Sequence, residues 1–319
     1  MLCERRICAV ESNLTLKPAG AATRRSPRIS PETVWGYIFI APWLIGFVIF
    51  AVGPIIASFF LSFTRYELIG DANWIGLDNY RTMFTNDRLF WTSLYNTAYY
   101  TLFSVPLGLM VAFLLAMLLN RPLRGIGVYR TIFYLPVVSS GVAISLLWIW
   151  LFNPQFGLIN YVIRLFGLPG PGWLVDSAWA KPAFILMSLW SVGGTVVIFL
   201  AGLQGVPRTL YEAAALDGAG PWRQFRHVTV PMMSPVIFFN LIIGIIGSFQ
   251  VFTQAYVMTG GGPQNATLFY VLHLFKQGFG LFRMGYAAAM AWVLFLIILA
   301  LTLLQMTLAR RWVYYASGE

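Results

Sequence analysis

Charged residues are scarce in this sequence, and their scarcity decides the broad class of protein. Asp, Glu, Lys and Arg make up 10% of the 319 residues, whereas apolar residues make up 59% and the mean hydropathy is +0.73. Soluble globular proteins contain roughly a quarter charged residues. The composition therefore excludes an ordinary water-soluble enzyme.

Charged side chains are missing from six long apolar stretches. These run roughly over residues 35–64, 94–120, 131–152, 182–205, 231–259 and 284–309. Each is close to or above the ~20 residues that cross a bilayer as a helix. Because lipid offers the backbone no hydrogen-bond partners, such runs must cross as helices. We expect an all-α membrane protein with six transmembrane helices.

Two further absences bear on the energy source. The sequence contains no G-x-x-x-x-G-K-[ST] phosphate-binding loop, so we expect this chain to bind no nucleotide and to hydrolyse no ATP. Ion-coupled carriers usually carry ionisable groups inside the membrane, and the six stretches have none. Ion coupling through hydroxyls and carbonyls stays open, so an ion-coupled secondary transporter is the alternative function.

Cysteine and histidine are also rare. Cys3 and Cys8 are the two cysteines, and His227 and His273 the two histidines. Two cysteines without nearby histidine make a poor metal site, so we expect free thiols and no metal. The histidines fall on opposite sides of the membrane in the expected topology, which argues against an integral membrane enzyme.

Positive charge indicates the orientation. With the amino terminus inside, the cytoplasmic segments hold 14 Lys and Arg and the external segments hold 7. Since Lys and Arg accumulate on the cytoplasmic side, we expect a protein of the bacterial inner membrane with both termini in the cytoplasm. The net charge of +10 then reflects topology and lipid contact, and not nucleic-acid binding. The apolar run after the basic first ~33 residues is too long for a cleavable signal peptide, so we expect it to be retained.

The expected organisation follows from these features. Residues 1–33 form a disordered cytoplasmic tail, residues 34–311 the six-span domain, and residues 312–319 a second cytoplasmic tail. A cytoplasmic loop at 205–231 joins the fourth and fifth spans.

Neutral polar side chains are the candidates for a translocation pathway. They are Trp190 and Thr195 on the fourth span and Ser248, Gln250 and Gln254 on the fifth. Gln250 and Gln254 are four residues apart and would share one face of a continuous helix. Because burying amides against lipid is costly, that face should meet another helix or a water-filled cavity. Interhelical hydrogen bonding and sugar binding both remain open.

The loop at 205–231 carries a distinctive pattern. Residues 208–217 are expected to form a short helix that ends at Gly218 in a left-handed cap, and a second short helix is expected after Gly220-Pro221. Ala213, Ala214 and Ala215 leave the first helix with little side-chain bulk, so another protein's backbone could approach closely. Glu212 and Asp217 flank this patch with negative charge.

This loop resembles the signature of the permease subunits of binding-protein-dependent ABC importers. The pattern is E-A-A, three residues, Gly, nine residues and I-x-L-P. Glu212, Ala213, Ala214, Gly218 and Pro231 match it, with Val228 and Val230 replacing Ile and Leu. The resemblance implies that the loop is the coupling helix that docks on the ATPase subunit, with Glu212, Ala213, Ala214 and Gly218 at that contact. We expect Asp217 to take part as well, because its charge flanks the same small patch.

Shorter segments extend the resemblance over most of the chain after residue 35. Gly76-Leu77-Asp78-Asn79-Tyr80, Asn96-Thr97, Gly260-Gly261-Gly262-Pro263 and Gly285-Tyr286-Ala287 are similar to carbohydrate permeases of the maltose and glycerol-phosphate type. The resemblance implies the ABC importer permease fold and a function in importing a sugar or glycerol-phosphate-like solute. The implied partners are a second permease, two cytoplasmic ATPase subunits that bind ATP and Mg, and an extracytoplasmic solute-binding protein.

Overall fold

The computed structural model describes residues 31–121 and 124–314. Most of the expected amino-terminal tail, including Cys3 and Cys8, lies outside the described residues, as does the end of the expected carboxy-terminal tail. The chain divides into two compact units, residues 1–54 and 55–319. The described part of the first unit consists of helix α1 (Pro31–Phe47), the π-helical turn η1 (Val48–Val52) and the start of α2 (Gly53–Leu61).

Helices also dominate the described part of the second unit. After the rest of α2, a short antiparallel hairpin pairs β1 (Thr64–Arg65) with β2 (Asn73–Trp74). The helices that follow, up to the loop, are α3 (Asp78–Thr85), α4 (Arg88–Leu119), α5 (Ile126–Val138), α6 (Gly141–Leu151), α7 (Leu158–Leu165), α8 (Ser177–Trp190) and α9 (Gly193–Gln204). The remaining helices are α10 (Arg208–Leu216), α11 (Pro221–Gln224), η2 (Phe225–Thr229), α12 (Val230–Phe249), α13 (Thr253–Met258), α14 (Tyr270–Phe275), η3 (Lys276–Gly280) and α15 (Met284–Ala309).

Within residues 31–121 and 124–314, four helical segments are long and apolar enough to cross a membrane. They cover Thr33–Leu61, Arg88–Leu119, Pro221–Met258 and Met284–Ala309. Two helix pairs satisfy the same criteria together, so the number rises to six if each bent pair is one span. The all-α membrane fold is thus confirmed with four to six candidate spans among the described residues, and the last span has the expected bounds.

The third and fourth spans differ from the continuous helices expected from their hydropathy. The third consists of α5 and α6 with a 102° bend between them, and the fourth of α8 and α9 with a 46° bend. Ser139 and Ser140 both have extended backbone conformations at the first break. Hydropathy did not reveal this break because the serines interrupt the apolar run for only two residues.

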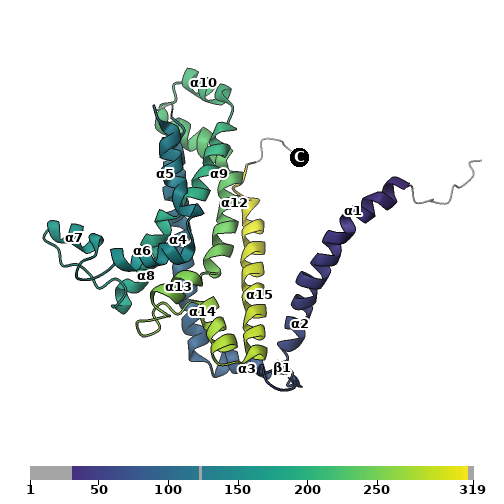
Figure 1. Cartoon of the computed structure of the whole chain (residues 1–319). Helices are drawn as coiled ribbons and strands as arrows, with labels where there is room; N and C mark the ends of the chain where they lie inside the picture. The colour runs from purple at the N-terminus through teal and green to yellow at the C-terminus, as the bar shows by residue number, and fades with distance from the viewer. Residues whose placement is uncertain (1–30, 122–123, 315–319) are drawn as a thin grey trace, which may run out of the picture. The chain divides into compact units, whose positions relative to one another are not determined.

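Helix α4 lies at the centre of the second unit and packs against α8, α9, α12 and α14 (Figure 1). Close backbone approach fixes the bent spans in this packing. A Cβ placed on Gly193 at the start of α9 would lie 2.2 Å from the carbonyl oxygen of Phe133 in α5. This separation is far below van der Waals contact, so only glycine lets α9 begin against the backbone of α5.

Candidate coupling loop and translocation site

Helix α10 lies at one end of the second unit, between the ends of α9 and α12 (Figure 1). It covers the residues that the loop sequence predicted as a short helix. The second predicted helix is not a separate element, because α11 begins at Pro221 and continues through η2 into α12 without a break. The loop is therefore one short helix followed by the start of the fifth span.

Gly218 closes α10 with a two-bond cap. Its φ is +75°, a left-handed conformation that costs L-residues with a side chain. The Gly218 N–H donates to the carbonyl of Ala215 at 3.0 Å, and the Ala219 N–H donates to that of Ala214 at 2.9 Å. These are the two bonds of a Schellman motif. The backbone carbonyls of Ala214 and Ala215 therefore hold the turn, and their small side chains leave little bulk on the helix surface.

The outer surface of α10 is uncovered. Glu212, Ala213 and Asp217 are exposed, and Leu216 is 90% exposed. The helix is attached on its other side, where the Tyr211 hydroxyl lies 3.0 Å from the Thr229 hydroxyl of η2. An anchored helix with an exposed leucine between two carboxylates is suited to contact with another protein.

The two predicted pathway residues of the fourth span lie on different helices of the bent pair. Trp190 is the last residue of α8, is 43% exposed and lies edge-on to Trp148 of α6, with ring centroids 6.0 Å apart. Thr195 is half-buried in the first turns of α9. The bend therefore places a tryptophan at one helix end and a hydroxyl just beyond it.

The predicted pathway residues of the fifth span do not share one helix. Helix α12 ends at Phe249, Gln250 follows as its exposed C-cap, and Gln254 belongs to α13. The expectation of a common helical face was wrong, because Phe252, with φ −136° and ψ −62°, interrupts the helical conformation between them. Gln254 lines a cavity of about 120 Å³ with Ser188 and Ser191 of the fourth span.

Ser248 is buried and bonded to a neighbouring helix. Its hydroxyl donates to the Thr101 hydroxyl of α4 at 2.9 Å. Of the two roles left open by the sequence, this contact supports interhelical hydrogen bonding for Ser248.

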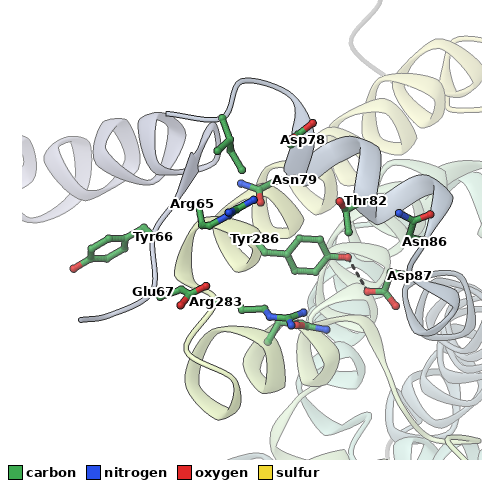
Figure 2. A pocket seen from close by; sticks show the side chains of 12 residues that line it. Arg65, Tyr66, Glu67, Asp78, Asn79, Thr82, Asn86, Asp87, Arg283 and Tyr286 are labelled. Carbon is green, nitrogen blue, oxygen red and sulfur yellow. Dashed lines mark hydrogen bonds between the residues drawn. The ribbon is translucent and has the colours of Figure 1, made fainter. Parts of the chain in front are cut away.

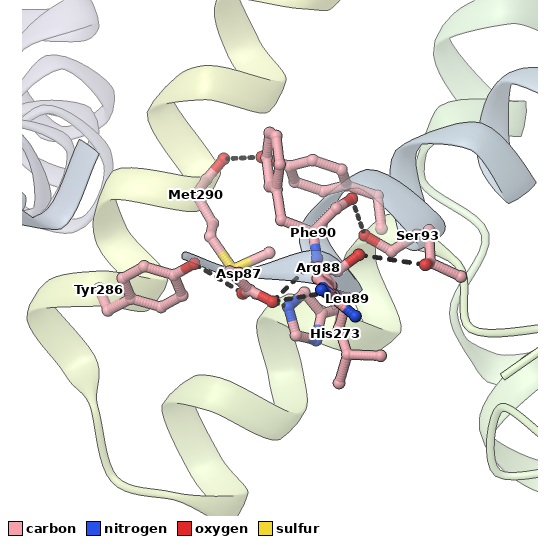
Figure 3. Close-up of polar contacts among 10 residues, drawn as sticks. Asp87, Arg88, Leu89, Phe90, Ser93, His273, Tyr286 and Met290 are labelled. Atoms are coloured by element: carbon pink, nitrogen blue, oxygen red, sulfur yellow. Dashed lines mark hydrogen bonds and ion pairs between the residues drawn. The ribbon is translucent and has the colours of Figure 1, made fainter. Parts of the chain in front are cut away.

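A carboxylate that the sequence analysis missed joins three elements at the end of the unit opposite α10. Asp87 caps α4 by accepting from the N–H groups of Leu89 and Phe90, and it also accepts from Tyr286 at 2.7 Å and contacts Nε2 of His273 at 2.9 Å (Figure 3). Burial raises the pKa of the Asp87 carboxyl, but hydrogen bonds from Tyr286 and His273 outweigh it, and the net pKa is below its usual range. The sequence signal for Asp87 was its position one residue before a helix, which predicts an N-cap. Nothing in the sequence indicated that Tyr286 and His273 would lie beside it.

The short segments that carry the family resemblance also gather at this end. Asn79 donates to the carbonyls of Ser62 and Thr64, and Asn96 donates to those of Asn265 and Leu268. The Asn96 side chain also accepts from Lys181 at 3.1 Å. Asn79 thus ties α3 to β1 and to the residues just before it, and Asn96 ties α4 to the loop before α14. The side chains of Asn79 and Asn96 are therefore used for contacts within the fold.

The comparisons with known proteins agree with this architecture. A family described as "Binding-protein-dependent transport system inner membrane component" matches residues 104–314. The chain belongs to this family. It is accordingly a multi-pass inner-membrane protein and a transport component, not an enzyme.

Two curated proteins and one solved structure show the extent of the likeness. The chain is 42% identical over 302 residues to a probable ABC transporter permease of Bacillus subtilis, YesP, covering 93% of this chain and 97% of that protein. It is 36% identical over 302 residues to the lactose transport system permease LacF of Rhizobium radiobacter, covering 91% and 99%. A bacterial ABC transporter that imports alginate has the same fold, with a TM-score of 0.77 and 24% identity over 88% of this chain and 96% of that one.

Proposed function

We propose that this chain is a permease subunit that moves a carbohydrate inward through a pathway shared with a second permease. The family depends on a binding protein, and a relative that matches nearly end to end is a lactose permease. Two cytoplasmic ATPase subunits, which hold ATP and Mg, drive transport, and an external solute-binding protein delivers the sugar. Both termini of this chain face the cytoplasm.

The observation that carries the proposal is the exposed surface of α10. Glu212, Ala213 and Asp217 are uncovered beside an exposed Leu216, and the helix is held at both ends by short turns. In the proposed mechanism the ATPase subunit covers this surface. Closure of the ATPase pair on ATP moves α10 and opens the pathway outward.

The proposed sugar contacts lie on the fourth and fifth spans. Gln250 offers an exposed amide, Gln254 lines the small cavity beside the fourth span, and Trp190 offers a partly exposed ring. Thr195 follows on α9. Amides suit sugar hydroxyls as donor and acceptor, and an aromatic ring suits the apolar face of a pyranose.

Two loop variants test the coupling role. Gly218→Val places a β-branched residue at φ +75° and strains the cap, and Glu212→Lys reverses a charge on the exposed face. We expect both to lose ATPase subunits during purification of the complex, or to lose ATP-driven uptake, while membrane insertion stays normal.

Gly220→Ala is the matched control for the cap. Gly220 has an ordinary φ of −68°, and a Cβ there meets no atom within 4 Å. It should behave as the wild type. Normal ATPase recruitment and uptake in both Gly218→Val and Glu212→Lys would defeat the coupling role and leave the ion-coupled carrier as the better account.

A further inference from the structure

Two pockets of the second unit lie at its opposite ends. Beside Asp87, a polar pocket of about 450 Å³ has walls from β1, α3, the start of α4, η3 and α15 (Figure 2). Its Asn79, Asp87 and Tyr286 side chains are occupied by hydrogen bonds within the fold. The other pocket, of about 530 Å³, lies beside α10. We call it the loop hollow, and its walls join the coupling loop to the end of the chain.

The walls of the loop hollow come from three places. Pro207, Thr209 and Leu210 at the start of α10 form one side, and residues between 227 and 232 at the junction of η2 and α12 form another. Tyr314, which follows α15, completes the wall. Because the space between these walls is open, α10 has room to move toward them.

The segment after α15 holds Tyr314 in place. The Trp312 N–H donates to the Ala309 carbonyl at 3.1 Å, which continues the chain as a tight turn. The Trp312 ring then lies edge-on to Phe238 of α12, with ring centroids 6.0 Å apart. We call residues 312–314 the carboxy-terminal strap. It fastens the end of the sixth span to the cytoplasmic start of the fifth.

The backbone of Tyr314 is bonded to a buried hydroxyl of α12. Pro235 has no N–H, so the carbonyl of Pro231 lacks its usual helical donor. The Ser234 hydroxyl donates to that carbonyl at 2.6 Å and accepts the Tyr314 N–H at 2.9 Å. Ser234 is 2% exposed, so the strap is anchored inside the protein while the Tyr314 ring, 55% exposed, lines the loop hollow.

Helix α10 itself is held by few contacts. None of its residues is buried. Within the described chain, the bond between the Tyr211 and Thr229 hydroxyls is the one side-chain hydrogen bond that α10 makes. A displacement of α10 into the loop hollow would therefore disrupt little packing.

We propose that Tyr314 is a positioning residue for energy coupling. When the ATPase subunit presses on α10, the helix closes the loop hollow against the Tyr314 ring. The strap then passes the displacement to α15, so that the fifth and sixth spans move together. This inference rests on the proposed function, because it takes α10 to be the contact with the ATPase.

Photocrosslinking in the complete importer tests the closure. Benzoylphenylalanine in place of Tyr314 keeps an aromatic ring in the wall of the hollow and forms adducts under light with its neighbours. We expect adducts with residues 207–210 of the same chain, identified by mass spectrometry. Their yield should be higher when the ATPase pair is trapped closed with ATP than without nucleotide.

The same group in place of Tyr129, exposed on α5 and outside the hollow, is the control and should give no adduct with residues 207–210 in either state. An equal or lower yield from position 314 in the closed state would overturn the proposal. Adducts formed mainly with the ATPase subunit would also overturn it, because the strap would then be part of the ATPase contact.

Two substitutions of Tyr314 test its effect on coupling, and both keep the backbone N–H that Ser234 accepts. Tyr314→Ala removes the ring, so α10 should move without moving α15. We expect the amount of sugar transported per ATP hydrolysed to fall by about fivefold, the lower end of ordinary coupling factors. Tyr314→Phe keeps the ring and should retain the wild-type ratio, as should Tyr129→Ala.

ATPase recruitment should stay normal in Tyr314→Ala, because the substitution leaves the outer surface of α10 intact. A lower Tm with an unchanged ratio of sugar to ATP would show that the ring is only structural and would refute the positioning role. Loss of ATPase subunits is expected of the α10 variants alone. Failure of the coupling role and failure of the positioning role are therefore separate outcomes.

Discussion

Asp87 is the side chain whose removal should most weaken the end of the unit opposite α10. Asp87→Ala removes the cap of α4 and both side-chain contacts, to Tyr286 and His273. It also leaves His273, which is 2% exposed, with a buried ring nitrogen that lacks this partner. We therefore expect a loss of stability without any change in the apolar packing.

The size of the effect follows from the bonds that are lost. An N-cap is worth about 1 kcal/mol, and each of the two contacts to the carboxylate is worth about 1.5 kcal/mol at the low end for charged groups. The total is about 4 kcal/mol. At roughly 2 °C per kcal/mol for a chain of this size, the apparent Tm should fall by about 8 °C.

Intrinsic fluorescence of the twelve tryptophans during heating of the reconstituted protein measures this shift. Asp87→Asn keeps an acceptor for the cap and should lose less. Asp71→Ala, an exposed carboxylate in the turn before β2, should leave the Tm unchanged. An Asp87→Ala protein that melts within about 2 °C of the wild type, when ~8 °C is expected, would show that these bonds contribute little.

The same network predicts a pH dependence. The pKa of Asp87 is lowered in the folded protein, so the unfolded chain binds the proton more tightly. The stabilisation is then present above the ordinary Asp pKa of ~3.9 and disappears as the pH falls through the lower folded value. The Tm difference between the wild type and Asp87→Asn should persist at neutral pH and close below about pH 4.

The remaining predictions concern the pathway and the energy source. Gln250→Ala should lower sugar uptake or shift sugar preference by about fivefold, with basal ATP hydrolysis retained. Normal transport in both Gln250→Ala and Trp190→Ala, with a less stable complex, would show that these two side chains are structural. Ser248→Ala should cost about 1 kcal/mol through the lost bond to Thr101, seen as a lower Tm with unchanged uptake. The purified chain alone should hydrolyse no nucleotide, and uptake by the complete importer should continue after proton and sodium gradients are collapsed; uptake that stops with an ionophore while ATP stays high would favour the secondary carrier.

Local signals in the sequence were sufficient for much of the fold. The last span matches α15 because its apolar run is bounded by Arg283 and Arg310 and contains no competing break. The loop helix and its Gly218 cap were predicted because capping depends on a few neighbouring residues. Such features need no knowledge of distant contacts.

Features that depend on distant partners were not predictable. The start of α9 is fixed by contact between Gly193 and the backbone of Phe133, sixty positions away. Asp87, His273 and Tyr286 meet only after folding, and the pocket beside them has walls from five elements. The break after Gln250 interrupts an apolar run without Pro or Gly at Val251 or Phe252, so hydropathy and turn chemistry both missed it.

The helix from Pro221 to Phe249 is continuous, so a tilt at one end displaces the other end. No flexible linker separates its first turn, three residues after the Gly218 cap, from its end at Gln250. These 29 residues span roughly 44 Å at 1.5 Å per residue. A tilt of about 5° at the loop therefore moves the far end by about 4 Å. If α10 is the coupling helix, as proposed, a small tilt imposed there therefore becomes a displacement of about 4 Å at Gln250.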